Sequence, residues 1–92
     1  MSDVVAIADL KERQVATVRG RVASVRVEPR DAAPTMTARV RDDTGVVDAV
    51  FMGRREIIGV EPGAVIDIEG RVCAGESVMC IYNPSYVLHS QS

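Results

Sequence analysis

The chain has 92 residues, a formal net charge of −2 and a hydrophobic fraction of 47%. This length suits one domain, and the apolar content is that of a globular protein, which excludes wholesale disorder. No apolar run is long enough for a membrane-spanning helix, and the N-terminal segment lacks the features of a signal peptide, so we expect a cytoplasmic protein.

The acidic balance argues against a strongly electrostatic nucleic-acid binder, because such proteins are usually basic overall. Arginine nevertheless supplies ten of the eleven basic residues, and Lys11 is the only lysine. A GC-rich genome would favour arginine codons for reasons unrelated to function. Guanidinium groups also suit phosphates and nucleobases, and composition leaves both explanations open.

The first half of the chain predicts a frayed end over residues 1–5, a short helical turn over Ile7–Arg13 and a strand over Val15–Val27. The apolar alternation of this strand changes phase near Ala23 and Ser24. One extra residue repairs the alternation, which predicts a β-bulge that bends the strand. Gly20 would let a neighbouring backbone come close.

A loop is expected over Glu28–Pro34, where prolines and an aspartate interrupt the strand. The alternating stretch Met36–Met52 then predicts a β-hairpin, whose turn is Asp42-Asp43-Thr44-Gly45. In this turn we expect an aspartate side chain to bond nearby backbone and the glycine to adopt a positive φ.

The two faces of the predicted hairpin differ in character. Parity places Phe51 in the core, together with the aliphatic residues of its face. Five residues share the outer face, namely Arg39, Arg41, Asp48, Val50 and Met52. One of the arginines could pair with Asp48 across the hairpin.

The second half predicts one helical turn at Ile57, Ile58 and Val60 that plugs a barrel end, and a tight turn at 61–63. Strands follow over Val65–Val72 and Val78–Tyr82, separated by a two-residue hairpin turn at Gly75-Glu76. Tyr86–His89 is expected to pair briefly before a polar tail.

The two cysteines flank that predicted turn. A two-residue turn places Cys73 opposite Val78, so that Cys80 is only its diagonal neighbour. Diagonal Cα atoms are about 7–8 Å apart, which exceeds the usual disulfide range. We therefore predict two reduced thiols, as is common in the cytosol.

These elements predict an all-β fold with no long helix. Two similar segments, Gly20-Arg21-Val22-Ala23 and Gly70-Arg71-Val72-Cys73, suit strands that bend at equivalent places in a closed barrel. Closure also removes exposed strand edges. We expect one domain over residues 1–92, a five-stranded Greek-key OB-fold barrel from about residue 15 to 88 with short flexible ends.

The order of these signals resembles the OB-fold nucleic-acid-binding family, which includes anticodon-binding domains. The resemblance extends to the wedge domain of the bacterial fork-remodelling recombination helicase and to free-standing OB-fold proteins of actinobacteria. It rests on Gly20-Arg21-Val22, Ala38–Gly45, Val47–Met52, Glu61-Pro62-Gly63, Gly70-Arg71-Val72 and Asn83-Pro84-Ser85-Tyr86. In the helicase the last motif commonly begins with His-Pro, from which Asn83 departs.

No pattern of catalytic chemistry is found in the sequence. Asp42-Asp43 is interpreted as part of a turn, and His89 has no evident Ser, Cys or Asp partner. Two cysteines alone do not make a structural zinc site. A phosphate-binding glycine loop and a catalytic triad are also missing. We therefore expect no enzyme activity, no cofactor, no metal and no small-molecule substrate.

The interpretation we favour is a module that binds single-stranded or branched DNA or RNA. OB-folds bind ligands across strands two and three and the flanking loops. On that basis nine residues are predicted to bind nucleic acid: Arg19, Arg21, Arg26, Arg39, Arg41, Met52, Arg54, Arg55 and Tyr82. Phosphate contacts would dominate, with affinity falling steeply as salt rises. The alternative is a protein-interaction or homodimerisation module that uses an apolar patch at Val50 and Met52.

Overall fold

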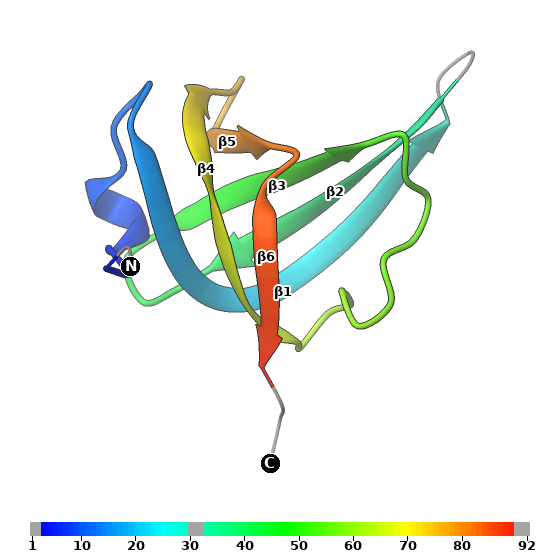
Figure 1. Ribbon diagram of the computed structural model, residues 1–92, viewed down its shortest axis with the longest axis horizontal. Helices are drawn as coiled ribbons and strands as arrows, with labels where there is room; N and C mark the ends of the chain where they lie inside the picture. The colour runs from blue at the N-terminus through cyan, green and yellow to red at the C-terminus, as the bar shows by residue number, and fades with distance from the viewer. Residues whose placement is uncertain (1–2, 30–32, 90–92) are drawn as a thin grey trace.

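The computed structural model describes residues 3–29 and 33–89. Six strands and one short 3₁₀ helix make up its regular structure (Figure 1). Their bounds are η1 Ile7–Asp9, β1 Val15–Pro29, β2 Pro34–Arg41, β3 Val46–Met52, β4 Val65–Ala74, β5 Met79–Tyr82 and β6 Ser85–His89.

Five of these strands close into a barrel, which confirms the predicted OB-fold architecture. Hydrogen-bonded neighbours follow the order β1-β2-β3-β5-β4, and β4 pairs in turn with β1. The β3–β5 pairing is parallel, whereas the other pairings are antiparallel. β6 adds to the side of β4, where the sequence predicted brief pairing.

The long first strand belongs to both halves of the barrel, around which it curves (Figure 1). Its residues 15–21 pair with β4, and its residues 21–29 pair with β2. The predicted bulge is confirmed, because the register with β2 shifts between Val22 and Ser24. Gly20 lies at the bend, where a Cβ atom would come within 2.5 Å of the Arg41 carbonyl oxygen.

The barrel interior is filled by aliphatic side chains from alternate strand positions. Val18, Val40, Ile66, Ile68 and Ile81 are fully buried. Phe51 also lies in the core, as predicted from its parity, and its ring meets the edge of the Tyr86 ring at a centroid distance of 5.8 Å. The strict alternation of these residues is what directs the polar positions of the same strands outward.

Several local predictions are wrong. Residues 4 and 5 are not frayed, because Val4 forms a bridge with Thr17 and the Val5 N–H donates to the Thr17 carbonyl. The first helical turn covers only Ile7–Asp9. Ile57 and Val60 are buried, but they form a hydrogen-bonded turn that leaves Ile58 89% exposed. Residues 1, 2 and 90–92, also predicted as flexible ends, lie outside the described ranges.

The hairpin turn between β2 and β3 is held by Asp42, as predicted. Its carboxylate accepts hydrogen bonds from the backbone N–H groups of Thr44 and Gly45, and also from that of Ile7 in η1. Gly45 is not among the described residues with positive φ, so that part of the prediction is wrong. The turn therefore depends on the aspartate side chain, which also docks η1 against the barrel.

The connection between β4 and β5 is longer than predicted. Ala74 pairs with Met79, so the loop contains residues 75–78 rather than two residues. Cys73 consequently lies directly opposite Cys80 and is not its diagonal neighbour. Both thiols are free.

Candidate nucleic-acid interface

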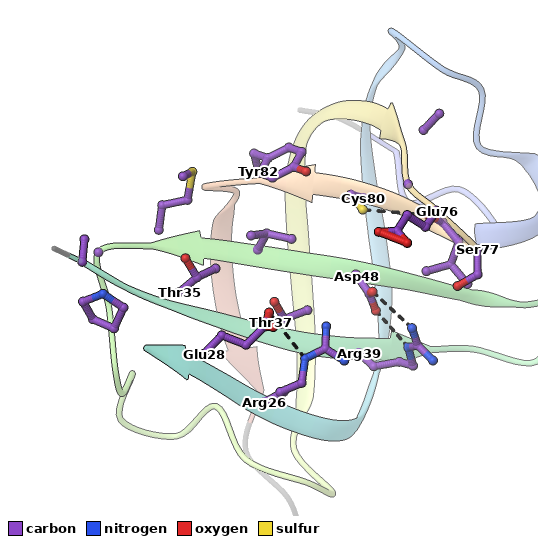
Figure 2. Close-up of a pocket in the computed structure, with 18 residues that line it drawn as sticks. Arg26, Glu28, Thr35, Thr37, Arg39, Asp48, Glu76, Ser77, Cys80 and Tyr82 are labelled. Carbon is purple, nitrogen blue, oxygen red and sulfur yellow. Dashed lines mark hydrogen bonds and ion pairs between the residues drawn. The ribbon is translucent and has the colours of Figure 1, made fainter. Parts of the chain in front are cut away.

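A groove of about 1200 Å³ crosses the outer face of β2, β3 and β5 (Figure 2). The distal part of β1 and the β4–β5 loop, residues 75–78, form its sides. It exists because the long β1 and β2 ribbon extends beyond the barrel, so that the sheet surface between this ribbon and the loop stays uncovered (Figure 1).

Strand register arranges the outward side chains of this face in three rows. The first row contains Ser24, Arg39, Asp48, Cys80 and Cys73, in order from β1 to β4. The second row contains Arg26, Thr37, Val50 and Tyr82. The third row contains Glu28, Thr35 and Met52. Since paired residues point to the same side of a sheet, each row crosses the face from one strand to the next.

The first row carries an ion pair between Arg39 and Asp48. The guanidinium donates two hydrogen bonds to the carboxylate, at 2.9 Å from Nε and 3.2 Å from Nη2. The Asp48 side chain is only 10% exposed. The hydrogen bond from Arg39 to Asp48, supported by their charge attraction, raises the pKa of Arg39 above its ordinary value. This pairing was the alternative that the sequence left open, and it neutralises the arginine at the centre of the face.

The second and third rows combine an uncharged floor with exposed ends. Thr37 and Val50 are buried at the floor. Tyr82 and Met52 remain 50% and 58% exposed, so a flat aromatic ring and a flexible thioether border the groove at the end distant from Asp48. Figure 2 shows Thr35 and Thr37 on the same strand face between Tyr82 and the arginines.

The groove does not have the positive charge of a phosphate channel. Its two arginines, Arg26 and Arg39, share it with three carboxylates, Glu28, Asp48 and Glu76. Arg26 lies 3.7 Å from Glu28, a pair in which both side chains are well exposed. Such exposed pairs are weak and reorganise easily. Of the two groove arginines, Arg26 is therefore the more readily available to a ligand.

Four of the nine predicted residues line the groove, namely Arg26, Arg39, Met52 and Tyr82. The other five lie elsewhere among the described residues. Arg19 donates two hydrogen bonds to Asp67, and Arg21 donates one to the Gly63 carbonyl. Arg41, Arg54 and Arg55 are exposed outside the groove.

The interpretation of His89 as partnerless is wrong. Its Nε2 lies 3.0 Å from Oδ1 of Asp67, the carboxylate that also binds Arg19. The hydrogen bond from Arg19 lowers the pKa of Asp67, a change that burial opposes and His89 supports. This cluster joins β1, β4 and β6 outside the groove.

The groove also contains polar residues that were not predicted to bind, among them Thr35, Thr37, Glu76 and Ser77. The two threonines share the parity of Arg39 on the predicted strand, and that signal could have identified them. Glu76 was assigned to the two-residue turn Gly75-Glu76, with Ser77 directly after it, and a turn of that length is too short to form a wall.

No group of three or more His, Cys, Asp or Glu side chains within residues 3–29 and 33–89 is arranged to hold a metal ion. In the same ranges, no helix has the length and apolar character needed to cross a membrane. The side chains that line the groove offer an aromatic ring, a thioether, a thiol, hydroxyls, carboxylates and guanidinium groups.

Comparison with known protein families gives one match, to the family described as OB-fold nucleic acid binding domain, over residues 16–87. The matched range begins in β1 and ends in β6, so it includes every strand of the barrel. A search of curated proteins finds no match.

Solved structures that share the fold include two with high coverage of this chain. The second OB-fold domain of replication protein A from Methanococcus maripaludis has a TM-score of 0.69 at 17% identity, and 98% of each chain is covered. The p204 HINb domain has a TM-score of 0.73 at 15% identity. That match covers 95% of this chain but 47% of the other, so this chain spans about half the length of the HINb structure.

Proposed function

The chain belongs to the OB-fold nucleic acid binding domain family, and on that premise we propose that it binds single-stranded DNA or RNA in the groove without catalysing a reaction. The ligand would cross the three rows, with branched DNA engaged through its single-stranded arms. Of the nine residues predicted to bind, the proposal retains Arg26, Arg39, Met52 and Tyr82.

The observation that carries the proposal is the half-exposed Tyr82 ring at the border of an uncharged floor. Tyr82 lies in register with Val50, and Val50 with Thr37. An exposed aromatic ring gives a base a stacking surface, worth about 1–3 kcal/mol per base. The neighbouring Met52 thioether can cover the edge of a stacked base, because methionine makes favourable contacts with aromatic rings.

The charge distribution supports a base-directed mode of binding. Thr35 and Thr37 offer hydroxyls that donate and accept hydrogen bonds with base edges. Arg26 can exchange its exposed partner Glu28 for a phosphate, whereas Arg39 is tied to Asp48 by two hydrogen bonds. Phosphate contacts would therefore be few. This differs from the steep salt dependence that the sequence suggested, and it makes stacking the larger contribution.

Fluorescence anisotropy with labelled oligonucleotides tests the proposal. Single-stranded DNA and RNA of mixed sequence should bind at low salt, and a fully paired duplex of the same sequence should bind more weakly. A Tyr82→Ala variant should lose affinity, while Val87→Ala, which shortens an exposed side chain on β6, should not. The proposal fails if no single strand binds at low salt.

A second candidate function is the binding of a protein segment in the same groove. The excess of carboxylates over guanidinium groups there, together with exposed Met52 and Tyr82, favours it. Sedimentation over a range of concentrations tests self-association. A dimer that is lost in Met52→Glu, with no oligonucleotide binding, would favour this second candidate.

A further inference from the structure

Cys73 and Cys80 occupy one end of the first row, and neither has a role in the proposed binding of nucleic acid. They are direct cross-strand partners in the antiparallel pairing of β4 and β5. Directly opposed residues in such a pairing have Cα atoms about 4.5–5.5 Å apart, which lies within the range of about 4.4–6.8 Å found for disulfides. The observed register differs from the one that the sequence predicted. It therefore meets the main distance requirement for a disulfide bond.

From this geometry we propose that Cys73 and Cys80 form a reversible disulfide by exchange with a small-molecule disulfide of the glutathione class. Each sulfur now lies near the carbonyl oxygen of the residue two positions before its own cysteine. Cys73 Sγ lies 4.0 Å from the Arg71 carbonyl oxygen, and Cys80 Sγ lies 3.8 Å from that of Val78. Residues 71 and 78 lie on opposite sides of the cysteine pair along the two strands, so rotation about χ1 of both side chains brings the sulfurs together.

The two thiols differ in access, which sets the order of the reaction. Cys73 is partly exposed, whereas Cys80 is buried. A Cβ atom at Gly75 would lie 2.7 Å from Cys80 Sγ, so the loop backbone covers that sulfur. Burial, with the nearby Asp48 and Cys73, also raises the pKa of the Cys80 thiol. Cys73 is the thiol that meets an external disulfide first.

The exchange takes place in two balanced steps. The Cys73 thiolate attacks one sulfur of oxidised glutathione, which forms a mixed disulfide and releases one glutathione thiolate. Cys80 then loses its proton to solvent, and its thiolate attacks the Cys73 sulfur and releases the second glutathione thiolate. Two protein thiols are oxidised and one glutathione disulfide is reduced to two thiols, which take up the two protons.

The product links the two strands directly beside the loop of residues 75–78, which forms one wall of the groove. Formation of the disulfide therefore restricts the loop that forms this wall. It leaves the side chains of Tyr82 and Arg26 chemically unchanged. Because the bond depends on strand register alone, its formation does not require that the groove bind nucleic acid. The two proposals can thus fail independently.

Incubation of the folded protein with mixtures of oxidised and reduced glutathione, followed by alkylation of free thiols and intact-mass measurement, tests the inference. The wild type should lose both alkylation sites without gaining glutathione, and excess reduced thiol should restore them. Cys80→Ser should instead retain one glutathione on Cys73. Cys73→Ser should stay mostly unmodified, since Cys80 is covered.

A matched control moves one thiol to the next position of the same strand. The double variant Cys73→Ser/Ala74→Cys keeps two thiols beside the same loop, but residue 74 pairs with Met79. This variant should form mixed disulfides with glutathione and no disulfide within the chain. A wild type that behaves like this control, forms only intermolecular dimers, or keeps both thiols alkylatable in excess oxidised glutathione would overturn the inference. Circular dichroism confirms that each variant is folded.

Discussion

Asp48 of β3 lies directly opposite Arg39 of β2, and two hydrogen bonds join the side chains across the middle of the groove. The carboxylate is the more buried partner, at 10% side-chain exposure against 40% for the arginine. The charge of Arg39, the most central arginine of the face, is thus already compensated before a ligand binds. This ion pair determines which ligands the groove can recognise.

Replacement of Asp48 by asparagine should strengthen the binding of single strands by about threefold to tenfold, because a gain near 1 kcal/mol is typical for removing an opposing charge. The amide keeps a hydrogen-bond acceptor for Arg39, while the positive charge of the arginine is no longer compensated by a carboxylate. Anisotropy titration measures the change. Asp67→Asn is the matched control, since it breaks a similar two-bond pair with Arg19 outside the groove. Equal effects from the two variants would contradict a role for the groove.

Tyr82→Ala should weaken binding by about 1–3 kcal/mol, the loss expected when one stacked base loses its platform. Tyr82→Phe should retain most of the affinity, because the ring and not the hydroxyl provides the stacking surface. Tryptophan is missing from the chain, so tyrosine fluorescence quenched by an unlabelled oligonucleotide gives a second readout. A Phe variant as weak as the Ala variant would point to the hydroxyl instead.

Salt should affect binding only modestly. With Arg26 as the groove arginine that contacts a phosphate, the slope of log K against log salt is about −0.7 for a single strand. Anisotropy titrations at several salt concentrations give this slope. Arg26→Ala should make it shallower, whereas Arg41→Ala and Arg54→Ala, both outside the groove, should leave it unchanged. A much steeper slope that depends on Arg41 would show that the ligand extends beyond the groove.

Gly20→Ala should destabilise the barrel by about 1–3 kcal/mol, the cost expected for forcing extra volume into a packed site. The new methyl would meet the Arg41 carbonyl oxygen at 2.5 Å and the Val40 side chain at 2.7 Å. Urea unfolding followed by circular dichroism measures the loss. Ser24→Ala, an exposed change just after the bulge, is the control and should stay within about 0.5 kcal/mol of the wild type.

Asp42 should make the stability of the fold sensitive to acid. Burial raises its pKa, but hydrogen bonds from Thr44, Ile7 and Gly45 outweigh burial and hold the pKa below its ordinary value. A carboxyl group with a lower pKa in the folded state stabilises the fold above its unfolded pKa. That contribution is lost as the pH falls through the folded pKa.

Asp42→Asn should therefore unfold at lower urea than the wild type at pH 7, by about 1 kcal/mol. The difference should shrink at acidic pH, where the wild-type carboxyl is protonated. Urea midpoints of both proteins, measured from pH 7 down to acidic pH, test whether the difference in stability shrinks. Asp43→Asn, at an exposed neighbouring position, is the control and should follow the wild type throughout. A gap that widens in acid would contradict the assignment.

The local pattern of apolar and polar residues was sufficient to predict most of the fold. The alternation over Met36–Met52 predicted β2, β3 and the burial of Phe51, and the phase break predicted the bulge between Val22 and Ser24. These features depend on a side-chain period of two and on glycine geometry, both of which are properties of neighbouring residues. The β4–β5 loop was misjudged because a glycine signals a turn without fixing its length, and each change of length shifts the register.

The sequence by itself determined which side chains face outward, because the pleat of a strand turns alternate residues to opposite sides. Only the tertiary structure decided what those side chains meet. Arg39 contacts Asp48, Arg19 contacts Asp67 from a strand 48 residues away, and Cys73 lies opposite Cys80. Such partners are set by the register and closure of the barrel, which no local pattern contains. For this reason four of nine predicted binding residues line the groove while the others lie elsewhere.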